Sequence, residues 1–366
     1  MIKEHCFTKG WFVSMSRKYR YNDLGIIEKV VRAYSLLDML ARSGCPYIFK
    51  GGTSVGLILG EGTKRLSIDI DIICPPGTNV DEYLDRITDF GFTRTELVER
   101  RQAGKDIPKT HSKFFYRIAY TDRSNQESYI LLDVLYEDSH YNQVNDVEVK
   151  NQFIELDEAP SIVKVPSIGD ILGDKLTAFA PNTTGIPYYK NGNPHSTEIM
   201  KQAYDIGRLF DAVDNLEITT KSFHRIALVE LGYRNLGSDV SVIYDDIRQT
   251  ALLLATRGLE GQGDFVQLQD GIKRLGSFIY EEKYFIEDAI VDSAKAAYVA
   301  TCIENGIMNI EKYEGSKLTT DMKIGRVLPT RLNKLKKQRP EAFYYWWMMD
   351  NILPLPFESA PSLRVP

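Results

Sequence analysis

KGGTSVGLILGEGTKRLSIDIDII, residues 50–73, joins a glycine turn to a strand that carries two aspartates. A short strand is predicted over residues 47–49, directly before the adjacent glycines, and a helix over residues 55–59 follows them. Residues 66–73 alternate between two kinds of side chain, which predicts a β-strand. This strand–turn–helix–strand order predicts a mixed α+β domain.

Asp69 and Asp71 lie on one face of the predicted strand, because side chains two positions apart point the same way. Their backbones are roughly 6.5 to 7 Å apart by the strand rise. Two anions this close raise each other's pKa, and a divalent cation removes the repulsion. Such hard oxygen ligands suit Mg²⁺, which binds one or two carboxylates together with substrate phosphates. Taken alone, the pair is more typical of two solvated aspartates on an exposed strand.

Asp133 interrupts the strongly apolar segment YILLDVLY, residues 129–136. Aspartate is disfavoured inside a strand of this kind unless it has a partner. Asp133 is therefore either a hydrogen-bonded structural residue or part of a site. If this strand pairs beside residues 66–73, three carboxylates converge as in a two-metal site for in-line phosphoryl or nucleotidyl transfer.

The turn formed by Gly51, Gly52, Thr53 and Ser54 combines backbone flexibility with two hydroxyl groups. Adjacent glycines let the backbone approach a ligand closely, and the start of the following helix supplies free N–H groups and partial positive charge. Together these features favour phosphate. The segment matches neither a Walker A loop nor a dinucleotide-binding fingerprint. Two glycines before a helix are more often a plain tight turn, so the order of turn, Asp-x-Asp strand and later aspartate is what indicates a nucleotide site.

That order resembles the DNA polymerase β-like nucleotidyltransferase superfamily. More narrowly, KGGTSVGLIL and KRLSIDIDI are similar to the signature of the AbiEii/AbiGii toxin family, which includes the MenT toxins. The family usually has a Gly-Gly-Thr/Ser turn followed by Arg-x-Ser-x-Asp-x-Asp, which Arg65, Ser67, Asp69 and Asp71 match residue by residue. The resemblance covers roughly residues 20–215.

A lysine on a helix beyond the strands is a further family feature, and PSIGDILGDKLTAFA after residue 165 offers Lys175. Ser167 is a natural N-cap for that helix. Lys175 falls within the apolar stripe, so it either extends along apolar surface to water or points into a cleft with an anionic partner. The resemblance implies the second role, in which Lys175 binds the triphosphate and neutralises the leaving pyrophosphate.

The next helix, predicted over about residues 198–214, departs from the family pattern. Gln202 stands where the family has its first aspartate, so only Asp205 can take the acidic role. An ion pair within the helix, on its polar face beside Lys201, explains Asp205 equally well.

The resemblance assigns the following roles. Asp69, Asp71 and Asp133 bind metal. The nucleotide is bound by Gly51, Gly52, Thr53, Ser54, Arg65, Ser67 and Lys175. The catalytic residues are Asp69, Asp71, Asp133, Lys175 and Asp205.

The 366 residues suggest two domains. Residues 1–165 are predicted to form the catalytic domain, a mixed sheet with flanking helices, and residues 166–366 a mainly α-helical domain that contributes Lys175 and substrate-binding surface. The 43% hydrophobic and 26% charged residues are typical of a soluble globular protein. Four scattered cysteines favour a reducing cytosol, and the lack of a long apolar stretch argues against a transmembrane helix. We therefore expect a cytoplasmic protein.

The formal net charge of −5 means that any nucleic-acid site must be a local basic patch. Residues 323–339 contain seven basic residues and no acidic one, which fits either phosphate contact or a solvated face. The aromatic run 343–347 is more typical of a buried helix, although it could stack unpaired bases. A second basic stretch, residues 100–117, could line the same groove.

The resemblance implies a nucleotidyltransferase with an NTP as substrate and two Mg²⁺ ions as cofactors. It further implies transfer of NMP to tRNA, in the role of toxin of an AbiE-type toxin–antitoxin pair with a cognate antitoxin protein. Two alternatives stay open: an enzyme that modifies a small molecule or a protein hydroxyl, and a nucleotide-binding regulatory module without turnover. The Gln202 departure leaves the second of these possible.

Overall fold

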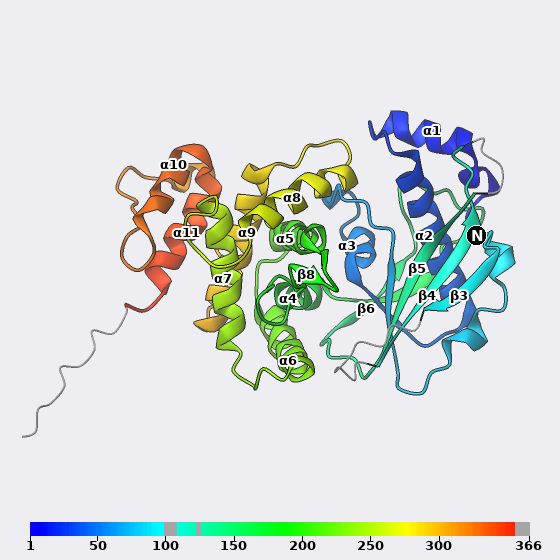
Figure 1. The fold of residues 1–366 in the computed structure, drawn as a ribbon, viewed down its shortest axis with the longest axis horizontal. Helices are drawn as coiled ribbons and strands as arrows, with labels where there is room; N and C mark the ends of the chain where they lie inside the picture. Colours follow the sequence, from blue (N-terminus) through cyan, green and yellow to red (C-terminus); the bar gives the residue numbers. More distant parts are fainter. Residues whose placement is uncertain (99–107, 122–125, 356–366) are drawn as a thin grey trace, which may run out of the picture.

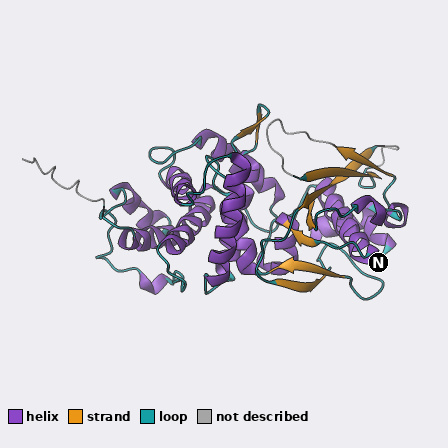
Figure 2. Cartoon of the chain, turned by 90° about the horizontal axis from the view of Figure 1, so that it is seen from below, coloured by secondary structure: helices purple, strands orange, loops and turns teal. Residues whose placement is uncertain are grey.

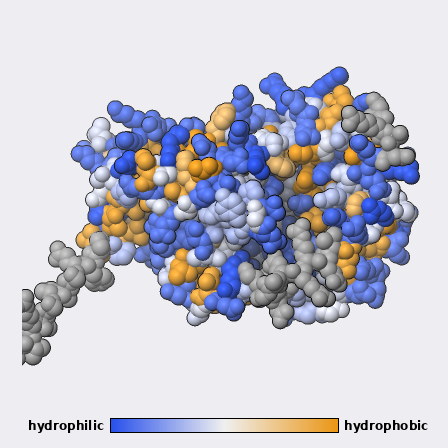
Figure 3. Space-filling model, viewed as in Figure 1, coloured by the Kyte–Doolittle hydropathy of each residue, from blue (hydrophilic) through white to orange (hydrophobic). Residues whose placement is uncertain are grey.

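The computed structural model describes residues 1–98, 108–121 and 126–355. Figure 1 shows the large sheet at one end of the molecule and the helices that follow residue 167 toward the other. The α+β class expected from the sequence is confirmed. Among the described residues, no helix has the combination of length and apolar character needed to cross a membrane. Hydrophilic residues cover most of the face seen in Figure 3, with hydrophobic residues in scattered groups.

The helices are α1 (Lys9–Lys18), α2 (Leu24–Ser43), α3 (Gly51–Leu59), α4 (Ile168–Ala178), α5 (Ser196–Asp211), α6 (Glu217–Arg234), α7 (Ser241–Ala255), α8 (Phe265–Leu275), α9 (Ile286–Glu304), α10 (Leu335–Gln338) and α11 (Pro340–Ile352). The strands are β1 (Ile48–Lys50), β2 (Ile70–Cys74), β3 (Arg94–Val98), β4 (Lys109–Arg117), β5 (Glu127–Tyr136), β6 (Val144–Glu148), β7 (Ile162–Pro166), β8 (Tyr189–Lys190) and β9 (Asn193–Pro194).

A five-stranded sheet in the order β1-β2-β5-β4-β3 organises the first half of the chain. β2 and β5 run parallel and the other neighbours run antiparallel. One face is buried through Phe114, Tyr116 and Leu132, and Arg32 of α2 lies over the Tyr116 ring. Figure 2 shows the sheet as a layer beside the N-terminal helices, with the helical bundle at the far end.

The opposite face of the sheet is covered at one corner by the helices that follow residue 167, which we call the helical half. There Ile73 of β2 forms a small buried cluster with Tyr141 and with Ile226 of α6. Toward β3 and β4 this face becomes exposed, and Tyr129 of β5 keeps 40% of its accessible surface. The sheet therefore has one buried face and one face that passes from covered to open.

The strand predicted over residues 66–73 begins only at Ile70, which corrects its start by four positions. The residues before it pair with the helical half instead of with the sheet. The Leu66 N–H donates to the Phe278 carbonyl at 2.8 Å, and Arg65 forms an isolated bridge with Ile279. Asp71 thus lies within β2, whereas Asp69 lies just before it.

Helix α4 starts where the sequence indicates, because the Ser167 hydroxyl accepts a hydrogen bond from the Asp170 N–H at 3.2 Å. The helix packs against α5 and α6, and α9 packs against α5, α7 and α11. This arrangement holds the α4 and α5 side chains against the loop that leads into β2.

Four of the five residues in the aromatic run of α11 are core, so the base-stacking alternative is wrong for them, whereas Trp347 is half-buried. Phe343, Tyr344, Tyr345 and Trp346 are at most 2% exposed. The Tyr345 ring meets Phe210 of α5 edge to face at 5.2 Å. These rings bury apolar surface between helices and leave no face for a base.

The described residues of the two basic stretches do not line one groove. Residues 323–339 lie around α10, at the end of the molecule away from β3, β4 and β5 (Figure 1). Within that stretch Arg331 contacts Glu260 at 3.1 Å and Lys336 donates to two backbone carbonyls. Of the second stretch, Lys109, Lys113 and Arg117 lie on β4. Arg100, Arg101 and Lys105 fall outside the described residues.

Candidate active site

Four polar side chains form a row across one face of the sheet. Lys50 of β1 lies opposite Asp71 of β2, which lies opposite Asp133 of β5, which lies opposite His111 of β4. Directly opposed residues in a sheet project from the same face. We call Lys50, Asp71, Asp133 and His111 the carboxylate row. The pairing of β2 with β5 that a three-carboxylate site requires is present.

The side-chain carboxylates of Asp69 and Asp71 form no hydrogen bond or ion pair with any described residue. Burial first, and then the Asp133 carboxylate, raise the pKa of Asp71 to about 6 against the opposing effect of Lys109. The pKa of Asp69 is also raised, first by partial loss of contact with water and then by Asp133, although Lys201 opposes this. Two unpartnered carboxylates in an environment that disfavours their charge form a site that attracts a cation.

Asp133 is already paired, unlike its two neighbours. Its carboxylate accepts a hydrogen bond from His111 Nδ1, and Lys109 Nζ lies 3.1 Å from Oδ2. Burial alone would raise the pKa of Asp133, but His111 and Lys109 lower it overall. The third carboxylate is therefore held in its ionised form by two neighbouring side chains.

The carboxylates of Asp69 and Asp71 are better suited to a metal ion that binds together with a nucleotide than to a metal ion held by protein side chains alone. Within residues 1–98, 108–121 and 126–355, no group of three Asp, Glu, His or Cys side chains is arranged to hold an ion by itself. Mg²⁺ usually takes one or two protein carboxylates and completes its shell with phosphate oxygens and water. Asp69 and Asp71 can supply those carboxylates.

The glycine turn brings backbone directly against the carboxylate row. Gly51 begins α3 with φ +79°, and a Cβ at this position would lie 2.1 Å from Asp71 Oδ2. A Cβ on Gly52 would lie 2.5 Å from Arg65 Nη2 and 2.9 Å from Ser67 Oγ. Both positions therefore require glycine for close approach, and the N-terminus of α3 faces Asp71.

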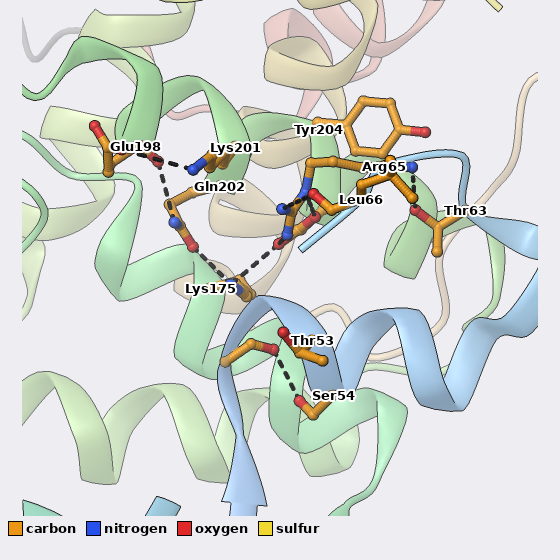
Figure 4. A network of polar contacts seen from close by, with 12 residues as sticks. Thr53, Ser54, Thr63, Arg65, Leu66, Lys175, Glu198, Lys201, Gln202 and Tyr204 are labelled. Atoms are coloured by element: carbon orange, nitrogen blue, oxygen red, sulfur yellow. Dashed lines mark hydrogen bonds and ion pairs between the residues drawn. The ribbon is translucent and has the colours of Figure 1, made fainter. Parts of the chain in front are cut away.

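The two hydroxyls of the turn are used internally, which differs from their expected role as nucleotide ligands. Thr53 Oγ1 donates to the Asp69 carbonyl at 2.5 Å, and Ser54 Oγ donates to the Gly51 carbonyl at 2.8 Å. Figure 4 shows the Thr53 and Ser54 side chains at the turn. Both side chains are buried. They fix the turn relative to Asp69, and the groups left to contact a ligand are the backbone N–H groups at the start of α3.

Arg65, Lys175, Gln202 and Asp205 form a second cluster, which we call the junction network. Figure 4 labels the first three of these residues. Asp205 accepts hydrogen bonds from Arg65 Nε and Nη2, both at 2.8 Å, and lies 3.1 Å from Lys175 Nζ. Lys175 also donates to Gln202 Oε1 at 2.9 Å. Arg65 and Asp205 side chains are at most 3% exposed, so Arg65, expected to bind nucleotide, is instead a buried partner of Asp205.

The alternative in which Asp205 pairs with Lys201 of its own helix, α5, is not observed. Lys201 lies 3.6 Å from Glu198, and Asp205 is paired outside its own helix. Burial alone would raise the pKa of Asp205, but Arg65 and Lys175 lower it. Both carboxylate oxygens of Asp205 are therefore engaged by the neighbouring cations.

Several polar residues near the carboxylates escaped the sequence analysis as site candidates. Lys50 lies 3.4 Å from Asp174 of α4, and Asp174 also accepts a hydrogen bond from Tyr141. Lys201 lies 4.4 Å from the Phe278 ring centre, and its pKa is lowered by burial and by Arg65. The lysine that begins KGGTS was a visible signal for Lys50, but His111 is recognisable only from the register of β4 against β5.

Comparisons with known proteins give a family match and a shared fold. The sequence model described as "Nucleotidyl transferase AbiEii toxin, Type IV TA system" matches residues 35–298. MenT4, a nucleotidyltransferase toxin from Mycobacterium tuberculosis H37Rv, has a similar structure, with 12% identity and a TM-score of 0.50 over 93% of this chain and 99% of that one. A protein from H. pylori, provisionally described as a nucleotidyltransferase, has 14% identity and a TM-score of 0.37 over 77% of this chain and 94% of that one. No match was found among curated protein sequences.

Proposed function

Since this chain belongs to the AbiEii nucleotidyltransferase toxin family of type IV toxin–antitoxin systems, we propose that it transfers NMP from an NTP to tRNA in a Mg²⁺-dependent reaction. The observation that carries this proposal is the pair of unpartnered carboxylates, Asp69 and Asp71, beside the N-terminus of α3. A triphosphate and its metal ions need just such a combination of oxygen ligands and positive backbone dipole. Family membership also implies an antitoxin partner.

Asp69, Asp71 and Asp133 would hold two Mg²⁺ ions, which when bound neutralise phosphate charge and lower the pKa of the acceptor hydroxyl. Asp133 already accepts hydrogen bonds, and its lowered pKa makes it a weak proton acceptor. We therefore assign Asp133 to holding metal and orienting the acceptor hydroxyl. Asp71, whose pKa is raised to about 6, binds metal only after it loses its proton.

Lys175 is the residue that we assign to the triphosphate. Figure 4 shows the Lys175 amine between Gln202 and the turn that begins α3. The charged groups of that network are Arg65, Lys175 and Asp205, two cations and one anion, so the network carries one net positive charge. That charge and the N-terminus of α3 would together bind the phosphates and stabilise the leaving pyrophosphate.

A cytoplasmic location is part of the same proposal, because tRNA and NTPs are found there. The four cysteines are free and buried, which is compatible with a reducing compartment.

The test is nucleotide incorporation by the purified protein. Wild type, Asp71→Asn and the control Asp146→Asn are incubated with total tRNA, Mg²⁺ and each NTP labelled at the α-phosphate. Asp146 is an exposed aspartate that pairs with Lys164 on the surface, so its substitution should leave transfer intact. Label should enter tRNA with wild type and Asp146→Asn, and not with Asp71→Asn.

Other outcomes would redirect the assignment. Label in protein or in a small molecule, and not in RNA, would overturn the tRNA proposal in favour of another acceptor. NTP binding without incorporation into any acceptor would indicate a regulatory module.

A further inference from the structure

A pair of aromatic rings lies on the open part of the sheet, on the same face as the carboxylate row. Phe115 of β4 is opposite Tyr129 of β5, and their ring centres are 5.7 Å apart with the planes tilted by 53°. Asp133 is four positions further along β5, so alternation places it on the face that carries Tyr129. Four residues of strand span roughly 13 Å. The rings therefore lie beside the candidate active site and not on a remote surface.

Two lysine amines flank the exposed ring. Lys113 Nζ lies 4.8 Å and Lys29 Nζ lies 5.6 Å from the centre of the Tyr129 ring. Neither lysine forms an ion pair with a described residue. The Lys29 charge also opposes the rise in the pKa of Asp69, which stays raised overall, so the Lys29 amine is within electrostatic reach of that carboxylate. Lys29 thus links the aromatic pair to the site.

The neighbouring arginine plays a different part. Arg94 lies over Phe115, with Cζ 3.5 Å from the ring centre, and pairs with Glu96 at 3.3 Å and Glu127 at 3.4 Å. Its charge is already compensated, and it covers one face of Phe115. The positive charge left for a ligand therefore comes from Lys29 and Lys113.

An exposed tyrosine flanked by two ammonium groups that form no ion pair with a described residue has the two elements that unpaired nucleic acid needs. Bases stack on aromatic faces, and phosphates between them contact lysine. An acidic peptide would use the amines but gain nothing from the rings. Double-stranded nucleic acid would use the amines but could not insert its paired bases.

We propose that Phe115, Tyr129, Lys29 and Lys113 form a stacking platform for unpaired bases near the end of the acceptor RNA, which they hold beside Asp69, Asp71 and Asp133. This inference rests on the proposed function, since it names the part of the surface that would bind the acceptor. The platform lies at the opposite end of the molecule from the basic run at residues 323–339 (Figure 1).

The first test is binding without NTP. The probe is a fluorescein-labelled single-stranded oligoribonucleotide of about ten nucleotides, which is within the site size of aromatic nucleic-acid surfaces, and a blunt duplex of the same sequence is the comparison. The variant is the double substitution Phe115→Leu with Tyr129→Leu, which keeps apolar side chains on the sheet. The control is Phe285→Leu, which removes an aromatic ring that is 56% exposed elsewhere.

We expect the double variant to weaken single-strand binding by roughly fivefold or more. Fivefold is the smallest effect expected when one stacked base is lost. Duplex binding and the thermal unfolding midpoint should not change, and Phe285→Leu should bind as wild type. Lys113→Gln should make the slope of log affinity against log salt concentration shallower by the amount expected for the loss of about one phosphate contact. Equal single-strand affinity of the double variant and wild type, or no single-strand binding at all, would overturn the platform.

The second test, transfer kinetics, separates this inference from the proposed function. If wild type labels RNA, the double variant should raise the KM for RNA and leave kcat unchanged. An unchanged KM would remove the platform while the nucleotidyltransferase assignment stands. Platform-dependent single-strand binding by a protein that labels no RNA would instead support the platform and overturn the tRNA proposal.

Discussion

Arg65 and Asp205 form a bidentate ion pair, with both nitrogen–oxygen distances at 2.8 Å, although 140 positions separate them in the chain. Arg65 belongs to the loop that leads into β2, and Asp205 belongs to α5. The pair therefore joins the sheet to the helical half at the point where Lys175 approaches the turn that begins α3. Its geometry determines where the lysine charge lies relative to Asp69 and Asp71.

Replacing Asp205 with asparagine should destabilise the protein and abolish transfer. The change leaves the Arg65 guanidinium and the Lys175 ammonium side by side without a carboxylate. Removing one partner of a buried ion pair costs about 3 to 5 kcal/mol. We expect a fall of that size in the free energy of unfolding measured in urea.

Asp146→Asn is the matched control, because Asp146 pairs with Lys164 at 3.0 Å on the surface, where each side chain is more than 60% exposed. Loss of an exposed pair costs about 0 to 1 kcal/mol. Equal unfolding midpoints for the two variants would show that the Arg65–Asp205 pair does not hold the halves together.

Gln202→Glu should weaken NTP binding without unfolding the protein. Gln202 Oε1 accepts a hydrogen bond from Lys175 at 2.9 Å, and a glutamate would retain that contact. The added negative charge would cancel the net positive charge of the junction network. We expect the KM for NTP to rise roughly tenfold, the equivalent of about 1.4 kcal/mol, with little change in the KM for the acceptor.

Gln338→Glu makes the same substitution at an exposed position of α10 and should change neither constant. If Gln202→Glu also leaves the KM for NTP unchanged, Lys175 does not contact the triphosphate.

Features of the fold and site that depend on a local pattern could be predicted from the sequence. The apolar strand interrupted by Asp133 and the Asp-x-Asp segment each show a carboxylate in an apolar setting, and their strands are neighbours in the sheet. Likewise, Ser167 and the apolar stripe around Lys175 were enough to place α4. Each of these features depends on residues that are close together in the sequence, within one or two helical turns or within one strand.

What was missed depends on register and on contacts between distant segments. His111 joins the carboxylate row only because β4 pairs with β5 in one register, and a shift by one residue would turn it to the buried face. The pattern around Asp205 left an ion pair with Lys201 on the helix surface as an open alternative, whereas the folded chain buries Asp205 and pairs it with Arg65 and Lys175. The aromatic run in α11 shows the same limit, because composition alone does not distinguish a stacking surface from a core.

Stability without divalent cations should depend on pH through Asp71. Its pKa is raised to about 6 in the folded protein, from 3.8. Between these values the folded state binds more protons than the unfolded state, so the free energy of unfolding falls as pH rises from about 4 to above 6. Asp71→Asn should remove this dependence and stabilise the protein at pH 7 by about 1 to 3 kcal/mol.

Asp133→Asn provides the comparison of opposite sign. The pKa of Asp133 is lowered in the folded protein, so its contribution to stability is present above the ordinary carboxyl pKa and is lost as pH falls. Removing Asp133 should therefore destabilise the protein at neutral pH. Urea unfolding in EDTA across this pH range measures both effects, and parallel profiles for the two variants would contradict the assigned directions.

Gly51→Ala should abolish Mg²⁺-dependent transfer by displacing the Asp71 carboxylate. An alanine Cβ at position 51 would lie 2.1 Å from Asp71 Oδ2, so that carboxylate must move. Gly44→Ala is a close control, since Gly44 has φ +78° against +79° at Gly51, but a Cβ there would meet no atom within 4 Å. Both variants should lose about 1 kcal/mol to the left-handed backbone conformation, because alanine tolerates it less well than glycine. Only Gly51→Ala should lose Mg²⁺-dependent incorporation. Equal activity of the two variants would show that the contact between the turn and Asp71 does not position the metal ligands.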